Sequence, residues 1–283
     1  MITISKGFKR IFTDRLTALF FILFFLTFCM VGCGTLELNS DWRDREIIVD
    51  GSNDDWLGNM MYFEKEYVSL GLLNDENFIY ICLIAEDQII RNQVMGQGFT
   101  LWFDPDGGKK KTFGIKFPIG IQPGERQDRR KRPGGVPNKE KRDEADIEEL
   151  RQARMKRMAE LEIFGPEKEK SVRMPVEKAK GIYINVKLSS GMLVYEIKVP
   201  LERSEEYPYA VGTKAGNLVG IGLETSKIER QNVRRSMGGR TGGMGGRGGA
   251  GGRGRAGGTR GGGMRPQMPK PLKIWAVVQL ASK

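Results

Sequence analysis

The feature that most limits the fold of this 283-residue chain is a series of short apolar runs, each of strand length, with little helix-forming sequence between most of them. The run Asn77–Glu86 (NFIYICLIAE) is apolar on both faces, as a central strand would be. Parallel strands need long crossover connections, so we predict antiparallel pairing. About nine strands are expected, at Glu46–Asp50, 60–72 (one or two strands), Asn77–Glu86, Phe99–Asp104, Thr112–Pro118, Gly181–Leu188, Met192–Val199, Asn217–Glu224 and Leu272–Leu280.

These runs predict a mainly β domain, an antiparallel β-sandwich over residues 46–283, with an open barrel as the alternative. Two insertions interrupt the strands. Residues 119–180 are highly charged, and 138–163 within them have the composition of one helix, which Gly165-Pro166 would end. The mixed charge favours a solvated helix, packed by a narrow apolar stripe of Ile147, Leu150, Met158 and Leu161.

The N-terminus has the pattern of a bacterial lipoprotein signal. Four basic residues and one acid lie within residues 1–15, before the apolar run Leu16–Val31. This run has about 16 residues, fewer than the roughly 20 that span a bilayer comfortably. Small residues precede Cys33, and the junction resembles a lipobox with Cys33 as the lipidated residue. We predict a signal peptide over 1–32, with an uncleaved N-terminal anchor as the alternative.

The lipobox resemblance implies an exported protein that lipid on Cys33 holds on a membrane of the cell envelope. Gly34, in place of an aspartate after the cysteine, favours the outer membrane of a Gram-negative bacterium. Residues 33–45 are expected to be a short polar tether. Cys29 leaves with the signal, so no intramolecular disulfide is expected, and the apolar surroundings of Cys82 predict a small buried hydrophobe.

The net charge of +11 is spread unevenly along the chain. Residues 124–180 hold 17 basic and 13 acidic residues, whereas 227–273 hold 12 basic residues and one acid. The rest of the mature chain sums to −7. The folded body is therefore expected to be acidic, and the basic whole-chain pI does not indicate a nucleic-acid partner for it.

The second insertion, residues 228–271, is rich in glycine and arginine. Residues 237–263 contain 16 glycines, a composition that cannot bury a core and predicts a disordered loop. Arg-Gly-Gly repeats bind polyanions through charge and arginine stacking. Export argues against nucleic acid and favours an anionic polysaccharide, lipid head groups or an acidic protein; a solvated linker without a ligand is the alternative. The candidate arginines are Arg240, Arg247, Arg253, Arg255 and Arg260.

Three phrases resemble carbohydrate-binding module family 9. The first is Ile47-Ile48-Val49-Asp50-Gly51-Ser52-Asn53-Asp54-Asp55-Trp56, and the second is the strand Phe78-Ile79-Tyr80-Ile81 with Asp87 after it. The third is Leu101-Trp102-Phe103-Asp104-Pro105. The similarity covers about residues 46–118 and only loosely the C-terminal strands. It implies a β-sandwich and glycan binding. Members of this family often sit beside catalytic domains, but no such domain is predicted in this sequence.

Glycan binding requires exposed aromatic rings for the C–H faces of sugars and polar groups for the hydroxyls. Trp56 and Trp102 are candidate platforms, each with a place in the core as the alternative, and Asp87 and Asp104 are candidate polar ligands. Trp42 and Trp275 are further candidates. Asp104 and Asp106 are also weak candidates for Ca²⁺, although Asp-Pro-Asp-Gly is equally an ordinary hairpin turn.

Signals of catalysis are poor. The chain has no histidine, no nucleophile elbow, no phosphate-binding loop and no zinc motif. We therefore predict a non-enzymatic, membrane-anchored lipoprotein whose sandwich binds a glycan. The alternatives are a structural or assembly lipoprotein that binds a protein partner or an anionic surface and, more weakly, a glycan-processing enzyme. No cofactor is expected, with Ca²⁺ left open.

Overall fold

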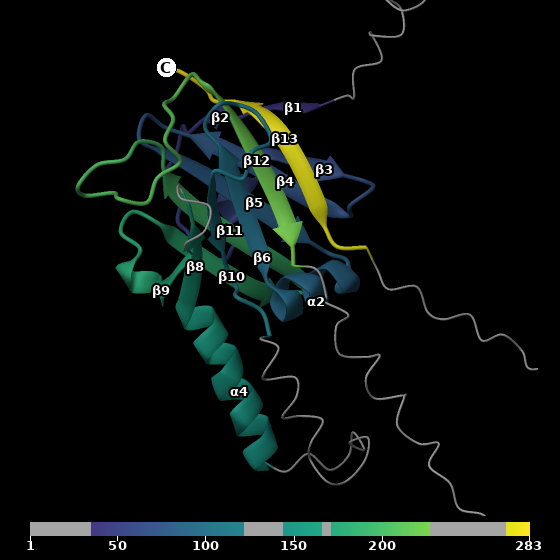
Figure 1. The fold of residues 1–283 in the computed structure, drawn as a ribbon. Coiled ribbons are helices and arrows are strands. Elements are labelled where there is room, and N and C mark those ends of the chain that lie inside the picture. Colours follow the sequence, from purple (N-terminus) through teal and green to yellow (C-terminus); the bar gives the residue numbers. More distant parts are fainter. Residues whose placement is uncertain (1–34, 122–143, 166–170, 227–269) are drawn as a thin grey trace, which may run out of the picture. The chain divides into compact units, whose positions relative to one another are not determined.

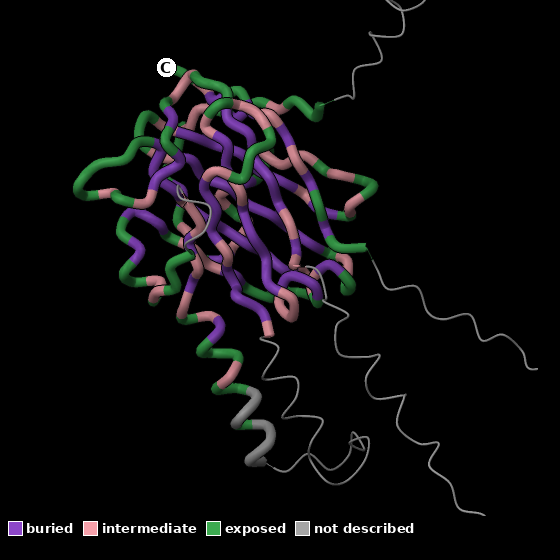
Figure 2. Tube along the Cα trace, viewed as in Figure 1, coloured by how far each residue is buried: buried purple, intermediate pink, exposed green. Residues whose placement is uncertain are grey.

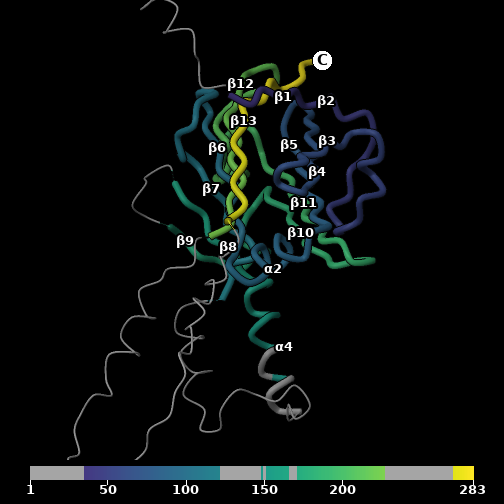
Figure 3. The backbone as a smooth tube through the Cα atoms, turned by 90° about the vertical axis from the view of Figure 1, so that its right-hand side faces the viewer, coloured from purple at the N-terminus to yellow at the C-terminus, as the bar shows by residue number. Residues whose placement is uncertain are grey.

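The computed structural model describes residues 35–121, 144–165, 171–226 and 270–283. The chain divides into two units, Met1–Leu36 and Glu37–Lys283, and the second unit holds two facing β-sheets (Figure 1). Figure 3 shows the sheets edge-on as two layers, one containing β6, β7, β12 and β13 and the other β4, β5, β10 and β11. The predicted mainly β sandwich is thereby confirmed.

The two sheets are built as follows. The seven-stranded sheet has the order β1 (Leu36–Asn39), β13 (Lys273–Gln279), β12 (Leu218–Thr225), β6 (Phe99–Asp104), β7 (Phe113–Lys116), β8 (Glu160–Phe164) and β9 (Ser171–Pro175). The six-stranded sheet has the order β10 (Tyr183–Ser189), β11 (Met192–Pro200), β5 (Phe78–Ala85), β4 (Val68–Asn74) and β2 (Asp41–Trp42), with β3 (Met60–Phe63) also on β4. The β2–β4 pair is parallel, and β3, β5, β10 and β11 pair antiparallel.

The alternation along each strand decides which side chains fill the space between the sheets. In β5, Ile79, Ile81 and Leu83 point into this main core, as do Leu101 and Phe103 of β6. Figure 2 shows this buried interior running along both sheets. The even-numbered residues of β5 lie on the outer face, where a second apolar cluster forms around Trp56 and includes Tyr80, Cys82, Ile84 and Val194. Cys82 is fully buried there, as predicted.

Two α-helices lie within the described residues. Helix α2 (Gln88–Gln97) was not predicted from the sequence. It contacts strands of both sheets and closes one end of the sandwich. Helix α4 (Glu144–Ala159) confirms the predicted charged helix but ends earlier than expected. Residues 160–164 form β8, in which Leu161 and Ile163 are both buried. Leu161 therefore follows the two-residue period of a strand, and placing it on the helix stripe was wrong.

Other boundaries also differ from the prediction, and thirteen strands form among the described residues rather than about nine. Residues 46–50 are not a strand, because Ile47 packs on the outer cluster while the chain makes local bonds such as Asp50 N to Ile48 O, 2.9 Å. The predicted tether contains β1 and β2, and Ser40 joins it to β13 through its N–H to Gln279 O, 3.0 Å.

The predicted signal peptide lies outside the described residues. In the part of the chain that the structure describes, no helix has the length and apolar character needed to cross a membrane.

Candidate functional site

The outer face of the seven-stranded sheet carries a row of aromatic side chains that comes from strands far apart in the sequence. In the register, Trp275 of β13 is opposite Gly222 of β12, which is opposite Trp102 of β6. Trp102 is in turn opposite Gly114 of β7, which is opposite Phe164 of β8. Because paired residues point to the same face of a sheet, the three rings form one line across five strands. We call this line the tryptophan face.

Glycines allow the two indoles to lie flat on the sheet. A Cβ at Gly114 would come within 2.5 Å of Trp102 Cε3, and a Cβ at Gly222 would overlap the ring of Trp275. An alanine at either position would therefore push the indole away from the backbone. The result is a broad aromatic surface, in which Trp102, Trp275 and Phe164 are all partly exposed.

Further contacts hold the rings in place. Trp275 Nε1 donates to Gly108 O at 2.9 Å. The ring of Trp102 lies 5.2 Å from that of Phe164 with a tilt of 39°, and Lys111 Nζ lies over the Trp102 ring, 5.0 Å from its centroid. The indoles thus keep their orientation before any ligand arrives, which lowers the entropy that binding would lose.

A row of polar and charged side chains runs beside the aromatic line on the same face. The register places Glu224 opposite both Lys273 and Thr100, and Lys116 opposite both Thr100 and Glu162. Glu224 forms ion pairs with Lys273, at 3.7 Å, and with Lys111. These groups offer both donors and acceptors within reach of a ligand on the rings.

Trp56, predicted as a ligand platform, is instead a buried part of the outer cluster on the other sheet. Its side chain is 1% exposed, and its ring covers Gly71. Its Nε1 donates to Glu196 Oε1 at 2.7 Å, while Gly51 N donates to Glu196 Oε2 at 2.5 Å. Burial raises the pKa of Glu196, and the two N–H bonds lower it in part. The ring has no open face for a sugar.

The predicted aspartates also have structural places. Asp87 is the N-cap of α2, and its carboxylate accepts the N–H groups of Ile89 and Ile90 at 2.7 and 3.0 Å. Asp104 is fully buried and accepts Lys110 N at 2.7 Å and Asp106 N at 3.3 Å, which closes the turn after β6. Both carboxylates accept backbone N–H groups, and Asp104 is also closed off from a glycan by its burial.

The calcium candidates are not brought together with other ligands. Asp106 points to solvent and pairs with Lys110 at 3.3 Å. Among the described residues, no group of three or more acidic or cysteine side chains could hold a metal ion. Cys33 and the arginines Arg240, Arg247, Arg253, Arg255 and Arg260 lie outside the described residues.

A second set of aromatic residues lies on the outer face of the six-stranded sheet. Lys198 Nζ is 4.1 Å from the ring centroid of Phe78, 5.2 Å from that of Tyr183 and 5.5 Å from that of Tyr80. Tyr80 is buried, whereas Tyr183 is 56% exposed. Beside Tyr183 runs a groove of about 580 Å³ that Tyr207, Glu177, Glu206 and Lys180 also line.

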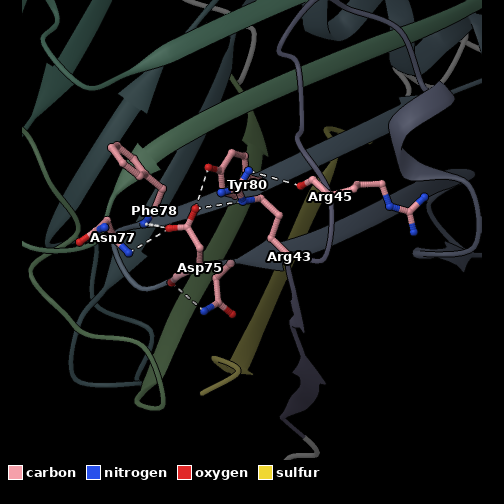
Figure 4. Close-up of polar contacts among 7 residues, drawn as sticks. Arg43, Arg45, Asp75, Asn77, Phe78 and Tyr80 are labelled. Carbon is pink, nitrogen blue, oxygen red and sulfur yellow. Dashed lines mark hydrogen bonds and ion pairs between the residues drawn. The ribbon is translucent and has the colours of Figure 1, made fainter. Parts of the chain in front are cut away.

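Asp75 fastens this end of the sheet, as Figure 4 shows. Its Oδ1 accepts Asn77 N at 2.9 Å and Phe78 N at 2.8 Å, and its Oδ2 accepts the hydroxyl of Tyr80 at 2.9 Å. Arg43 Nε pairs with the same Oδ2 at 3.0 Å. Burial raises the pKa of Tyr80, and the bond to Asp75 adds to this rise. All these groups have partners, so the cluster ties the start of β5 to the segment after β2.

Trp102 and Trp275 were candidates from the sequence, but their position on one face of the sheet could not be predicted. The signal that points to their arrangement is glycine inside a strand, at Gly114 and Gly222, since such a glycine often marks a close approach by another group. Knowing which ring approaches requires the register of β6, β7, β12 and β13, which the periodicity does not give.

No protein-family model and no curated protein matches this chain. Among solved structures, it is similar to a carbohydrate-binding module of family 9 from Caldicellulosiruptor kristjanssonii in complex with glucose, at 8% identity and a TM-score of 0.35, over 69% of this chain and 80% of that one. A module of the same family and organism in complex with cellotriose gives 9% identity and a TM-score of 0.34, over 69% and 78% of the two chains. The likeness is distant and concerns the fold alone.

Proposed function

We propose that this protein is a non-catalytic binding module that holds an extended glycan on the tryptophan face. The observation that carries the proposal is the row of Trp275, Gly222 and Trp102 in register. Two indoles that are two strands apart are separated by about 9.6 Å at the backbone. Two sugar rings of an extended chain can stack on them, while Glu224, Lys111 and their neighbours bind the hydroxyls.

The groove beside Tyr183 is the weaker of the two aromatic surfaces for glycan binding. The protein's own ammonium group, Lys198, already lies against the ring of Tyr183 and against those of Phe78 and Tyr80 beside it, and Tyr80 is buried. The tryptophan face has two partly exposed indoles, and Lys111, whose side chain is 44% exposed, can move aside when a sugar arrives.

The test is a glycan array with the purified protein, followed by calorimetry on the best ligand. Trp102→Ala and Trp275→Ala should each weaken binding by about 30-fold, or about 2 kcal/mol, because each change removes one stacking platform. Tyr183→Ala is the matched control on the opposite sheet and should leave affinity unchanged. Absence of binding to diverse neutral and acidic glycans would reject the proposal, and loss of binding only with Tyr183→Ala would move the site to the groove.

We further propose that lipid on Cys33 anchors the protein to the cell envelope, most simply at the outer membrane. The lipobox-like junction before Cys33 supports this proposal. Replacing Cys33 with serine should release soluble protein or leave uncleaved precursor, which fractionation and labelling with a radioactive fatty acid would detect. A Cys33→Ser protein that still carried label and was processed normally would contradict the anchoring.

A further inference from the structure

A cavity of about 410 Å³ lies where α2, α4 and the end of β10 meet, away from the residues of the tryptophan face. Helix α2 contributes Gln88, Arg91, Asn92, Met95 and Gly96. These positions recur at spacings of three and four, so they share one face of the helix. The other face, with Ile90, Gln93 and Val94, is buried against the sandwich. Arg154 and Arg157 of α4 and Leu188 of β10 complete the lining.

The lining is strongly basic. Three of its eight residues are arginines, and none of the eight is acidic. Arg154 and Arg157 are three residues apart on α4, so they lie on the same side of this helix and both line the cavity. The last turn of α4 carries Lys156 beside Arg157, which adds a further positive charge to this helix end. A cavity with this lining attracts anions.

Arg91 supplies a donor that is ready for such a ligand. Its Nη1 donates to Gly191 O, which fixes the guanidinium at the cavity. Its Nε is buried and has no hydrogen-bond partner in the part of the chain that the structure describes. A buried donor without a partner destabilises the protein, and a hydrogen bond to a ligand oxygen would remove this cost. Arginine also presents two parallel N–H groups, which match the two oxygens of a carboxylate or sulfate.

We propose that this arginine cavity binds an acidic sugar, by contact of its carboxylate or sulfate group with Arg91, Arg154 and Arg157. The remaining lining fits the rest of a sugar. Gln88 and Asn92 can donate to and accept from hydroxyls, and Met95 and Leu188 offer apolar surface to a C–H face. The volume lies within the usual range for small-ligand sites and exceeds what a bare inorganic anion would fill. The inference does not depend on glycan binding at the tryptophan face.

The experiment is calorimetric titration of the full protein with glucuronate and glucose 6-sulfate, with glucose and inorganic sulfate for comparison. The acidic sugars should bind at the arginine cavity and glucose should not, since it lacks the anionic group; any glucose bound at the tryptophan face should be unaffected by Arg91→Ala. Arg91→Ala and Arg154→Ala should each weaken binding by about tenfold or more. Arg151→Ala is the matched control, because Arg151 is an exposed residue of α4 that does not line the cavity. Trp102→Ala should leave this binding unchanged.

Several outcomes would overturn the proposal. No saturable binding of either acidic sugar would reject the site. Equal affinity for inorganic sulfate and the acidic sugars would show a simple anion site. An equal loss of affinity in Arg151→Ala would show that the net charge of α4, and not the cavity, determines binding of the acidic sugars. Thermal unfolding of each variant shows whether it is folded. If Arg91→Ala does not fold, Arg154→Ala still tests the cavity, because Arg154 is an exposed residue of α4.

Discussion

Trp56→Ala is expected to lower the free energy of unfolding by about 3–5 kcal/mol, the range for deletion of a large buried aromatic side chain. Trp56 is 1% exposed and forms the centre of the outer cluster with Ile47, Cys82 and Ile84. Its loss opens a cavity beside Gly71 and removes the N–H donor from Glu196 Oε1. The segment before β3 would then lose its main attachment to the six-stranded sheet.

Equilibrium unfolding in guanidinium measures this loss, and Trp56→Phe separates its two parts. Phenylalanine keeps an aromatic ring in the cluster but has no N–H group, so it should lose about 1–3 kcal/mol, less than alanine. Trp102→Ala, at a partly exposed position, should lose less than Trp56→Ala. A loss below about 1 kcal/mol for Trp56→Ala would mean that the ring does not pack on the sheet in solution.

The loss in Trp56→Phe should also depend on pH. Burial raises the folded pKa of Glu196 above its unfolded value, so protonation stabilises the fold at low pH and this stabilisation is lost as pH rises through the folded pKa. Removing the Trp56 N–H raises the folded pKa further, because that bond favours the carboxylate. Trp56→Phe, which keeps a ring in the outer cluster, should therefore be less destabilising near pH 4 than near pH 8.

The strands of the main core could be predicted from the sequence because their apolar residues alternate or run continuously. Phe78–Ala85 and Met192–Pro200 pack on each other with every second side chain in the main core, and both were predicted within a residue or two. The charged strand β8 was wrongly predicted as part of the preceding helix. Only Leu161 and Ile163 show the two-residue period of a strand, and they directly follow a long helical sequence.

The contacts that decide residue roles could not be predicted, because they join distant parts of the chain. Residues 46–50 alternate like a strand, yet the neighbouring Gly51 N–H bonds to Glu196, 145 residues away. The capping role of Asp87 could not be predicted, because the helix α2 that follows it was not predicted. The indoles of Trp102 and Trp275 become one surface only through the pairing of both β6 and β13 with β12.

Replacing residues 227–269 with a short Gly-Ser linker should leave the sandwich folded. The two ends of this segment are already side by side: Thr225 N donates to Leu272 O at 3.0 Å, and Glu224 pairs in register with Lys273. Gln93 of α2 fixes the same place, where its Nε2 donates to Lys270 O at 2.8 Å and its Oε1 accepts Leu272 N at 3.1 Å. A shorter loop loses less entropy on closure, so the free energy of unfolding should rise by about 1–2 kcal/mol.

The same deletion should abolish most salt-sensitive retention on heparin or on anionic lipid vesicles, because it removes Arg240, Arg247, Arg253, Arg255 and Arg260. In the intact protein, five scattered ion pairs at about 0–1 kcal/mol each cannot offset roughly 1–2 kcal/mol for each residue that they would order, so we expect these charges to be available to an outside polyanion. Unfolding of the deletion variant would make the segment structural. Unchanged retention would instead assign the polyanion binding to the basic residues of 124–180, and Arg154→Ala would then show whether the arginine cavity contributes.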